Sequence, residues 1–135
     1  MKILINTCFG GYNLSHEAML RYAELKGIAV YPENSLGGLY TYWLVPESER
    51  VDQSNWHSMS KEEQKASSKL YKEQTLYSKD FRTDPAMIQA VEELGAKANG
   101  RFAELKLVEI PDGMNYTIEE YDGLEHVAEV HRTWA

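Results

Sequence analysis

Two turn motifs near the end of the chain constrain its fold most strongly. Pro111-Asp112-Gly113 and Tyr121-Asp122-Gly123 combine residues that favour tight turns, and they frame a segment at 116–118 with the aromatic and β-branched residues of a strand. A tight turn joins antiparallel neighbours. We therefore predict that 116–118 pairs with the strand before it, at 101–110. The segment after the second turn, 124–134, fits either one helical face or a bent strand.

The last residues of the chain have a composition that is unusual for a flexible tail. Chain termini commonly fray, but residues 131–134 are a histidine, an arginine, a threonine and a tryptophan. We therefore expect the C-terminus to dock, either to complete the core or to complete a binding site.

Capping residues predict three helices. Ser15, Ser60 and Asp84 each precede a stretch with helical composition, and Ser60 opens a capping box with Glu63. Pro85 suits the first position of its helix. The predicted helices cover 15–26, 60–77 and 84–95. Short apolar runs predict further strands at 2–6, 28–31 and 39–45, with a loop at 32–38.

Composition shifts to polar residues at about 46–79, which are rich in Ser, Lys, Glu and Gln. The apolar stripe of the helix in this segment is thin, so we interpret 46–79 as an insertion packed loosely on the domain or against a second subunit. The expected fold is a single α+β domain over 1–135, with a small antiparallel-rich sheet, two to three helices and this helical insertion.

Composition limits the function classes. The 43% hydrophobic residues and fifteen aromatic residues are enough for a core in 135 residues, and no apolar run is long enough to span a membrane. The first residues are too short for a signal peptide, and the lone Cys8 suits a reducing compartment; both favour a cytoplasmic location. A net charge of −7 without a basic run makes nucleic acid a poor partner. It still permits a small anionic ligand held by a few arginines.

The loop at 7–13 places two glycines between a strand and a helix. Such a loop is either a plain tight turn or a place where backbone N–H groups meet an anion. In the second case Phe9 or Tyr12 offers a surface on which a base can stack. Further along, Asp84 is explained by helix capping and Phe81 by a hydrophobic staple. Capping does not explain Arg82.

Two weaker patterns are candidates for a metal site or a catalytic nucleophile. His126, Glu129 and His131 lie close in sequence, but their spacing matches no metal motif, and a surface helix end explains them more simply. Cys8 precedes a loop, and a small buried residue at a strand end is the simpler interpretation. We therefore expect no metal and no cofactor.

The strongest site candidate is the end of the chain. Arg132 supplies a fork for phosphate, Thr133 supplies a hydroxyl, and Asn115 is suited to a base or ribose edge. The structural alternative is that Trp134 fills the core while Arg132 caps a helix.

Several separated segments resemble a group of small proteins encoded in bacteriophage genomes. These segments are 5–18, 84–95, 110–113, 120–123 and 131–134. The group is in turn similar to the phage anti-Thoeris proteins of the first type, which are signal sponges. Those proteins bind cyclic ADP-ribose isomers made by bacterial TIR enzymes and hold them uncleaved, as oligomers with pockets at subunit contacts.

The resemblance implies that this chain is a phage immune-evasion protein in the host cytoplasm, assembled as a homodimer or a larger oligomer. An aromatic residue would stack on adenine, while arginines and an asparagine hold ribose and pyrophosphate. The matching positions are Arg132, Thr133 and Asn115, with Phe9 or Phe81 as the stacking residue. Arg82 is a further available cation.

Two other functions remain open at the level of sequence. An enzyme that degrades a nucleotide signal would need the cluster Glu125, His126, Glu129 and His131 as its acid–base pair. A protein-binding inhibitor of a host factor would use the tyrosine-rich strand at 39–45 together with the insertion.

Overall fold

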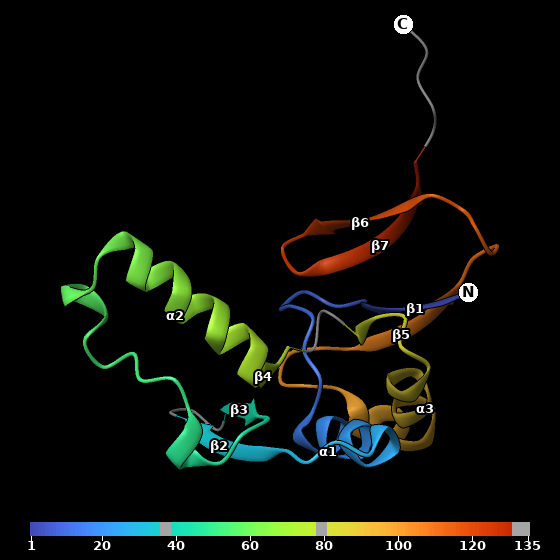
Figure 1. The fold of residues 1–135 in the computed structure, drawn as a ribbon. Coiled ribbons are helices and arrows are strands. Elements are labelled where there is room, and N and C mark those ends of the chain that lie inside the picture. Colours follow the sequence, from blue (N-terminus) through green and yellow to red (C-terminus); the bar gives the residue numbers. More distant parts are fainter. Residues whose placement is uncertain (36–38, 78–80, 131–135) are drawn as a thin grey trace, which may run out of the picture. The chain divides into compact units, whose positions relative to one another are not determined.

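The computed structural model of this chain describes residues 1–35, 39–77 and 81–130, and it confirms an α+β fold with antiparallel sheets (Figure 1). The chain divides into two compact units. Unit 1 comprises Met1–Lys26 and Ser78–Ala135, and unit 2 comprises Gly27–Tyr77. Unit 2 therefore contains most of the polar segment predicted at 46–79 and also the strands before it.

Unit 1 is built around its first strand. β1 (Lys2–Asn6) pairs antiparallel with β5 (Leu105–Glu109), and β6 (Tyr116–Tyr121) forms a hairpin with β7 (Leu124–Glu129). Figure 1 shows β1 and β5 between this hairpin and the helices of the unit. Ile3, Leu4 and Ile5 are consecutive and at most 4% exposed. Both faces of β1 are therefore covered, as its unbroken apolar run predicts.

The helices of unit 1 bury one face each. In α1 (His16–Lys26) and α3 (Pro85–Leu94), the buried residues recur at helical spacing: Ala18, Met19, Tyr22 and Ala23 in one, and Met87, Ala90 and Val91 in the other. The predicted caps are confirmed. Ser15 Oγ accepts from the Ala18 N–H at 3.1 Å, and Asp84 Oδ1 accepts from the Ala86 N–H at 2.9 Å. A 3-10 turn, η5 (Gly95–Ala98), follows α3.

Unit 2 is a three-stranded sheet with one helix. The strand order is β2 (Tyr31–Ser35), β3 (Leu39–Trp43) and β4 (Thr75–Leu76), all antiparallel. α2 (Lys61–Gln74) begins at the Ser60 cap, whose Oγ accepts from the Glu63 N–H at 3.1 Å. Two 3-10 turns, η2 (Glu47–Glu49) and η3 (Trp56–Ser58), lie between β3 and α2 along the chain.

Polar side chains hold α2 to the segment before it. Gln74 accepts from the Val51 N–H and donates to the Glu49 carbonyl, while Gln53 donates to Ser67 Oγ at 3.0 Å. These bonds replace the broad apolar stripe that most helices use. The polar composition of 46–79 is therefore compatible with a packed helix.

One strand prediction in the first half of the chain, and the loop predicted after it, differ from the structure. The strand predicted at 28–31 lies at Tyr31–Ser35, so much of the predicted loop at 32–38 is strand. Pro32 misled the prediction because proline breaks most strands, but β2 is an edge strand, where a missing N–H is tolerated.

The strand predictions near the C-terminus also need correction. The strand predicted at 101–110 begins only at Leu105, and β6 pairs with β7 rather than with β5. The ambiguous segment 124–134 forms a strand at Leu124–Glu129. Asp122 and Gly123 both have positive φ, 49° and 87°. A two-residue turn of this kind closes a hairpin, and the docking expected at 131–134 lies outside the described residues.

Two of the three confirmed caps, Ser60 and Asp84, differ in how many hydrogen-bonding groups their side chains contact, which allows a comparison. Ser60 accepts only the helix N–H, whereas Asp84 also accepts from the Tyr22 hydroxyl at 2.9 Å and pairs with Lys26 at 3.3 Å. We expect Ser60→Ala to lower the free energy of unfolding by about 1 kcal/mol and Asp84→Ala by about 2 kcal/mol or more, measured by urea denaturation.

The pH dependence of the same pair checks the mechanism. Partial burial raises the pKa of Asp84, but hydrogen bonds from Ala86, Tyr22 and Lys26 outweigh burial, and the net pKa lies below its usual value. The stabilisation by Asp84 is therefore fully present above the unfolded-state pKa of about 3.9 and is lost as the pH falls below it. A difference between wild type and Asp84→Ala that persists unchanged below about pH 3 would contradict this account.

Candidate functional site

A buried asparagine joins three loops of unit 1. The Asn6 side chain is fully buried; its amide donates to the carbonyl oxygens of Cys8 at 2.8 Å and Gly123 at 2.7 Å, and its Oδ1 accepts from the Glu104 N–H at 2.8 Å. Its backbone N–H donates to Glu125 Oε1 at 2.9 Å. One side chain thereby fixes the loop after β1, the segment before β5 and the β6–β7 turn.

These loops carry exposed aromatic residues. Phe9 is 63% exposed, Phe102 is 72% exposed and Tyr121 is 76% exposed. The Arg101 guanidinium lies 5.2 Å from the centre of the Phe102 ring. We call this set the three-loop surface: Phe9, Arg101, Phe102 and Tyr121.

The loops approach each other so closely that glycine is required at two places. A Cβ on Gly10 would lie 2.3 Å from the Phe102 carbonyl oxygen, and a Cβ on Gly123 would lie 2.6 Å from the Gly11 nitrogen. Phe102 itself has a φ of 62°, which is strained for a bulky side chain. Strained backbone persists only where the surrounding structure holds it, and such positions cluster at functional sites.

A buried ion pair adjoins the Asn6 network, because Glu125 accepts from the Asn6 N–H. The two terminal nitrogens of Arg82 donate to the two carboxylate oxygens of Glu125 at 2.9 and 2.8 Å, and Arg82 also donates to the Leu4 carbonyl at 3.0 Å. The guanidinium stacks 3.8 Å from the centre of the Tyr12 ring. Burial raises the pKa of the Tyr12 hydroxyl well above its usual value, against an opposing effect of Arg82, so Tyr12 stays neutral at physiological pH.

The structure gives two of the nominated binding residues structural contacts. Arg82 contacts Glu125, Leu4 and Tyr12 as described, and Phe81 stacks on Tyr22 with ring centres 4.6 Å apart. The contacts of Arg82 and Phe81 within unit 1 therefore explain why a cation and an aromatic ring stand at these positions without a ligand.

Phe9 and Asn115, the nominated residues that remain within the described part of the chain, lie at opposite ends of the β6–β7 hairpin. Phe9 lies beside the β6–β7 turn, because Gly10 N–H donates to the Asp122 carbonyl at 3.3 Å. Asn115 is exposed at the open end of the hairpin, where its carbonyl accepts from the Val130 N–H at 2.9 Å. Five residue steps of β6 separate the two ends, or about 17 Å. Arg132 and Thr133 lie outside the described residues.

The alternative catalytic cluster is divided between the faces of β7. Glu125 and Glu129 lie on one face and His126 on the other, because side chains alternate along a strand. Glu125 is committed to Arg82, and His126 contacts Glu119 at 2.8 Å on the exposed side. His131 lies outside the described residues. Within those residues no group of three or more His, Cys, Asp or Glu is arranged to hold a metal ion.

The Cys8 thiol is half-buried and close to two acceptors. It lies 3.1 Å from the Phe102 carbonyl oxygen and 3.4 Å from Asn6 Oδ1. These contacts place the thiol in the loop network, as expected for a small residue at a strand end.

Comparisons with known proteins returned no match: no family model, curated protein or solved structure matches the chain. Across 1–35, 39–77 and 81–130, the structure contains no helix with the length and apolar character needed to cross a membrane.

Sequence reasoning missed Phe102 and Tyr121 as surface residues. The sequence pattern places Phe102 in the strand predicted at 101–110 and Tyr121 in a turn, but both side chains are exposed. The signal available for Tyr121 was its position beside Asp122-Gly123, since residues that flank a two-residue hairpin turn project at the tip of the hairpin.

Two glycines in turns provide a matched test of the close packing. Gly113 (φ 78°) and Gly123 (φ 87°) have similar backbone angles, but a Cβ on Gly113 would meet nothing within 4 Å. We expect Gly113→Ala to cost only backbone strain, about 1–2 kcal/mol. Gly123→Ala should cost roughly 1–3 kcal/mol more, because its Cβ meets backbone atoms that cannot rotate away. Equal losses in urea denaturation would show that the loops are not tightly packed.

Removal of one partner of the buried ion pair should be far costlier than removal of an exposed one. Glu125→Ala leaves the Arg82 guanidinium buried without its carboxylate, and we expect a loss of about 3–5 kcal/mol. The control is Glu92→Ala, which breaks the exposed pair with Lys2 and should cost under about 1 kcal/mol. The double variant Arg82→Met/Glu125→Leu should recover part of the lost stability, because the Asn6 N–H and the Leu4 carbonyl still lose their side-chain partners. A double variant no more stable than Glu125→Ala would contradict this assignment.

Proposed function

We propose that this chain binds a cyclic nucleotide signal, of the cyclic ADP-ribose isomer class, and sequesters it without cleavage as a phage immune-evasion protein in the host cytoplasm. The observation that supports the proposal is the three-loop surface. Aromatic rings are the general stacking partner for bases, and a guanidinium beside them suits phosphate oxygens.

The three-loop surface is rigid in a way that favours ligand binding. Each of its loops is fixed through the Asn6 network, so ordering the backbone adds little to the entropic cost of binding. Large aromatic side chains that stay more than 60% exposed, on closely packed loops, add nothing to the core. Clustered exposed apolar residues of this kind mark binding surfaces.

The distance between the nominated residues supports an oligomeric pocket. Phe9 and Asn115 lie at opposite ends of the β6–β7 hairpin, about 17 Å apart along the strands. A pocket that uses both residues requires two copies of the chain. We propose that the three-loop surface of one copy and the open hairpin end of another, with Arg132 and Thr133, enclose the ligand between them.

The first experiment is native mass spectrometry of the purified protein with cyclic ADP-ribose isomers and with cyclic di- and trinucleotides, followed by heat release and chromatography. The proposal expects stoichiometric binding of one class to an oligomer, with the same molecule recovered unchanged. A changed product would mean an enzyme. Absence of any bound nucleotide would refute the proposal and favour a protein-binding inhibitor.

Variants then test the site itself. Phe9→Ala and Asn115→Ala should each weaken binding, and loss of one base–aromatic stack corresponds to roughly 5- to 150-fold. Tyr77→Ala, which removes another exposed aromatic residue (58% exposed) from unit 2, is the control and should bind normally. Isothermal titration calorimetry on folded variants measures these changes.

Mixing the two binding variants distinguishes a pocket between copies from one within a copy. A mixed dimer of Phe9→Ala and Asn115→Ala chains contains one site with both wild-type residues. Binding should therefore reappear on mixing, at up to one site per mixed dimer. If no binding reappears although mixed dimers form, the pocket does not span two copies.

A further inference from the structure

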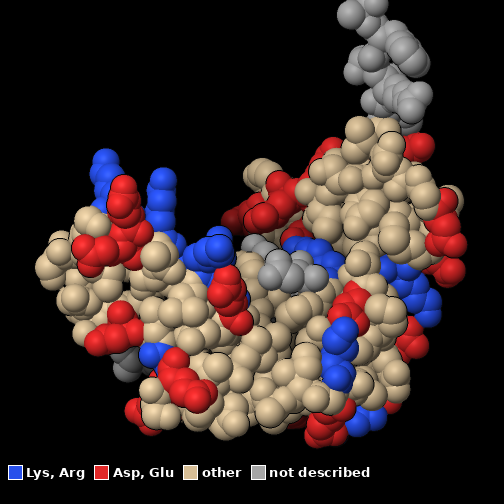
Figure 2. Space-filling model, in the orientation of Figure 1, with Lys and Arg blue, Asp and Glu red and all other residues tan. Residues whose placement is uncertain are grey.

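Four lysines that are not adjacent in sequence lie on one face of α2. Lys61, Lys65, Lys69 and Lys72 are separated by four, four and three residues. At 3.6 residues per turn they fall within an arc of about 80° and extend about 16 Å along the helix. Basic side chains stand out from the surface over α2 (Figure 2). We call this set the lysine face.

The lysine face differs in its pairing from several other cations of the protein. Lys2, Arg21, Lys26, Arg50 and Arg82 all make ion pairs with carboxylates. Within the part of the chain that the structure describes, none of the four lysines of α2 makes one. Like charges four residues apart on a helix destabilise it, so the spacings from Lys61 to Lys65 and from Lys65 to Lys69 do not themselves stabilise α2.

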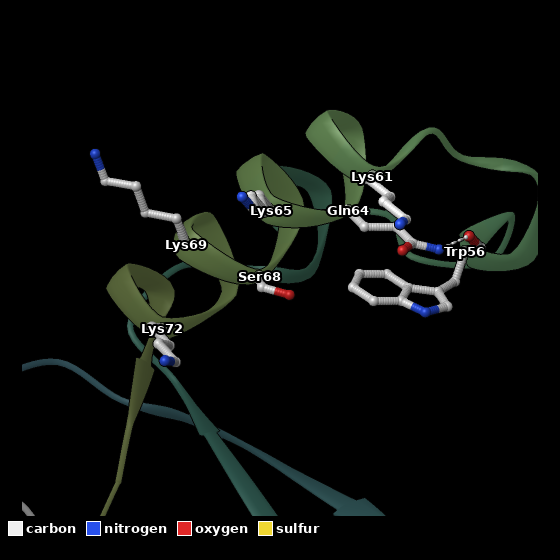
Figure 3. Close-up of a pocket in the computed structure, with 7 residues that line it drawn as sticks. All are labelled: Trp56, Lys61, Gln64, Lys65, Ser68, Lys69 and Lys72. Atoms are coloured by element: carbon white, nitrogen blue, oxygen red, sulfur yellow. Dashed lines mark hydrogen bonds between the residues drawn. The ribbon is translucent and has the colours of Figure 1, made fainter.

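An indole ring lies beside the lysine face. A surface hollow of about 580 Å³ is lined by Trp56, Gln64 and Ser68 together with the four lysines (Figure 3). Trp56 is half-buried, and its backbone is fixed at the start of η3: its carbonyl accepts from Gln64 Nε2 at 2.9 Å, and its N–H donates to the Gln53 carbonyl at 3.2 Å. The ring is therefore held next to the first turns of α2.

We propose that the lysine face and Trp56 form a binding site for a short stretch of single-stranded nucleic acid. Proteins that bind single strands without sequence preference combine a positive track for the phosphates with an aromatic ring on which a base stacks. The lysine face supplies a track longer than one nucleotide, and Trp56 supplies the ring. An acidic peptide would use the ammonium groups but would leave the indole without a stacking partner.

The proposed nucleic-acid site is compatible with the acidic net charge of the chain. The net charge of −7 argues against tight nucleic-acid binding by the chain as a whole. Charges farther apart than about 8 Å are largely screened at physiological salt, however, so local groups decide contact. Glu62 and Glu73 belong to α2 itself, flank the lysine face and limit its affinity. The site is therefore weak, salt-sensitive and independent of the proposed nucleotide function.

The test is fluorescence anisotropy with labelled oligothymidylate and oligouridylate of about ten nucleotides, titrated with the full chain at several salt concentrations. Four phosphate contacts predict a slope of about −2.8 for log affinity against log salt. Trp56→Ala should weaken binding about tenfold, and Lys65→Gln/Lys69→Gln should reduce the slope to about −1.4. Glu62→Gln/Glu73→Gln should strengthen binding.

Matched controls make the outcome decisive. Lys97→Gln/Lys106→Gln removes two exposed lysines of unit 1 and should leave the slope unchanged. Inorganic polyphosphate of similar length should bind as weakly as the Trp56→Ala variant binds oligonucleotide. Circular dichroism establishes that each variant is folded. The proposal is overturned if the oligonucleotides do not bind, if polyphosphate binds equally well and Trp56→Ala changes nothing, or if the unit 1 control loses as much affinity.

Discussion

The structure of unit 1 depends on the buried amide of Asn6. Its two N–H donors and its oxygen are all bonded to backbone groups of different loops, and its own N–H is bonded to Glu125. The β1–β5 and β6–β7 pairs each have only two strands, and an isolated two-stranded sheet is marginal in water. The two strand pairs are held together by the Asn6 network, by the Arg82–Glu125 pair and by the apolar residues of β1. A leucine at position 6 would leave these backbone groups buried and unpaired.

The same network gives the three-loop surface its shape. Because Asn6 holds loops that are far apart in sequence, the backbone can maintain close glycine contacts and the positive φ of Phe102. The exposed aromatic rings are thereby carried on a fixed backbone. Binding to such a surface would lose little backbone entropy. Phe9 and Asn115 lie at opposite ends of the β6–β7 hairpin, and the proposed pocket between two copies of the chain rests on that separation.

Unit 2 shows how local charge and overall charge differ in one small protein. Its helix packs through Gln64, Ser67 and Gln74 rather than through a broad apolar stripe. Polar packing through Ser67 and Gln74 leaves the opposite side of α2 free to carry lysines. Screening by salt separates that face from the acidic remainder of the chain. The polar composition of 46–79 thus reflects both a mode of packing and an available surface.

The sequence by itself determined what depends on neighbouring residues: the caps at Ser15, Ser60 and Asp84, the buried run of β1, the Asp122-Gly123 turn and the α+β class. Only the tertiary structure decided which strands pair, because β5 and β6 are adjacent in sequence yet take different partners. It also decided that Arg82 meets Glu125, forty-three residues away, and that Phe81 stacks on Tyr22. Local signals act over a helical turn or a hairpin, whereas these contacts follow from the burial of distant segments, which no local pattern encodes.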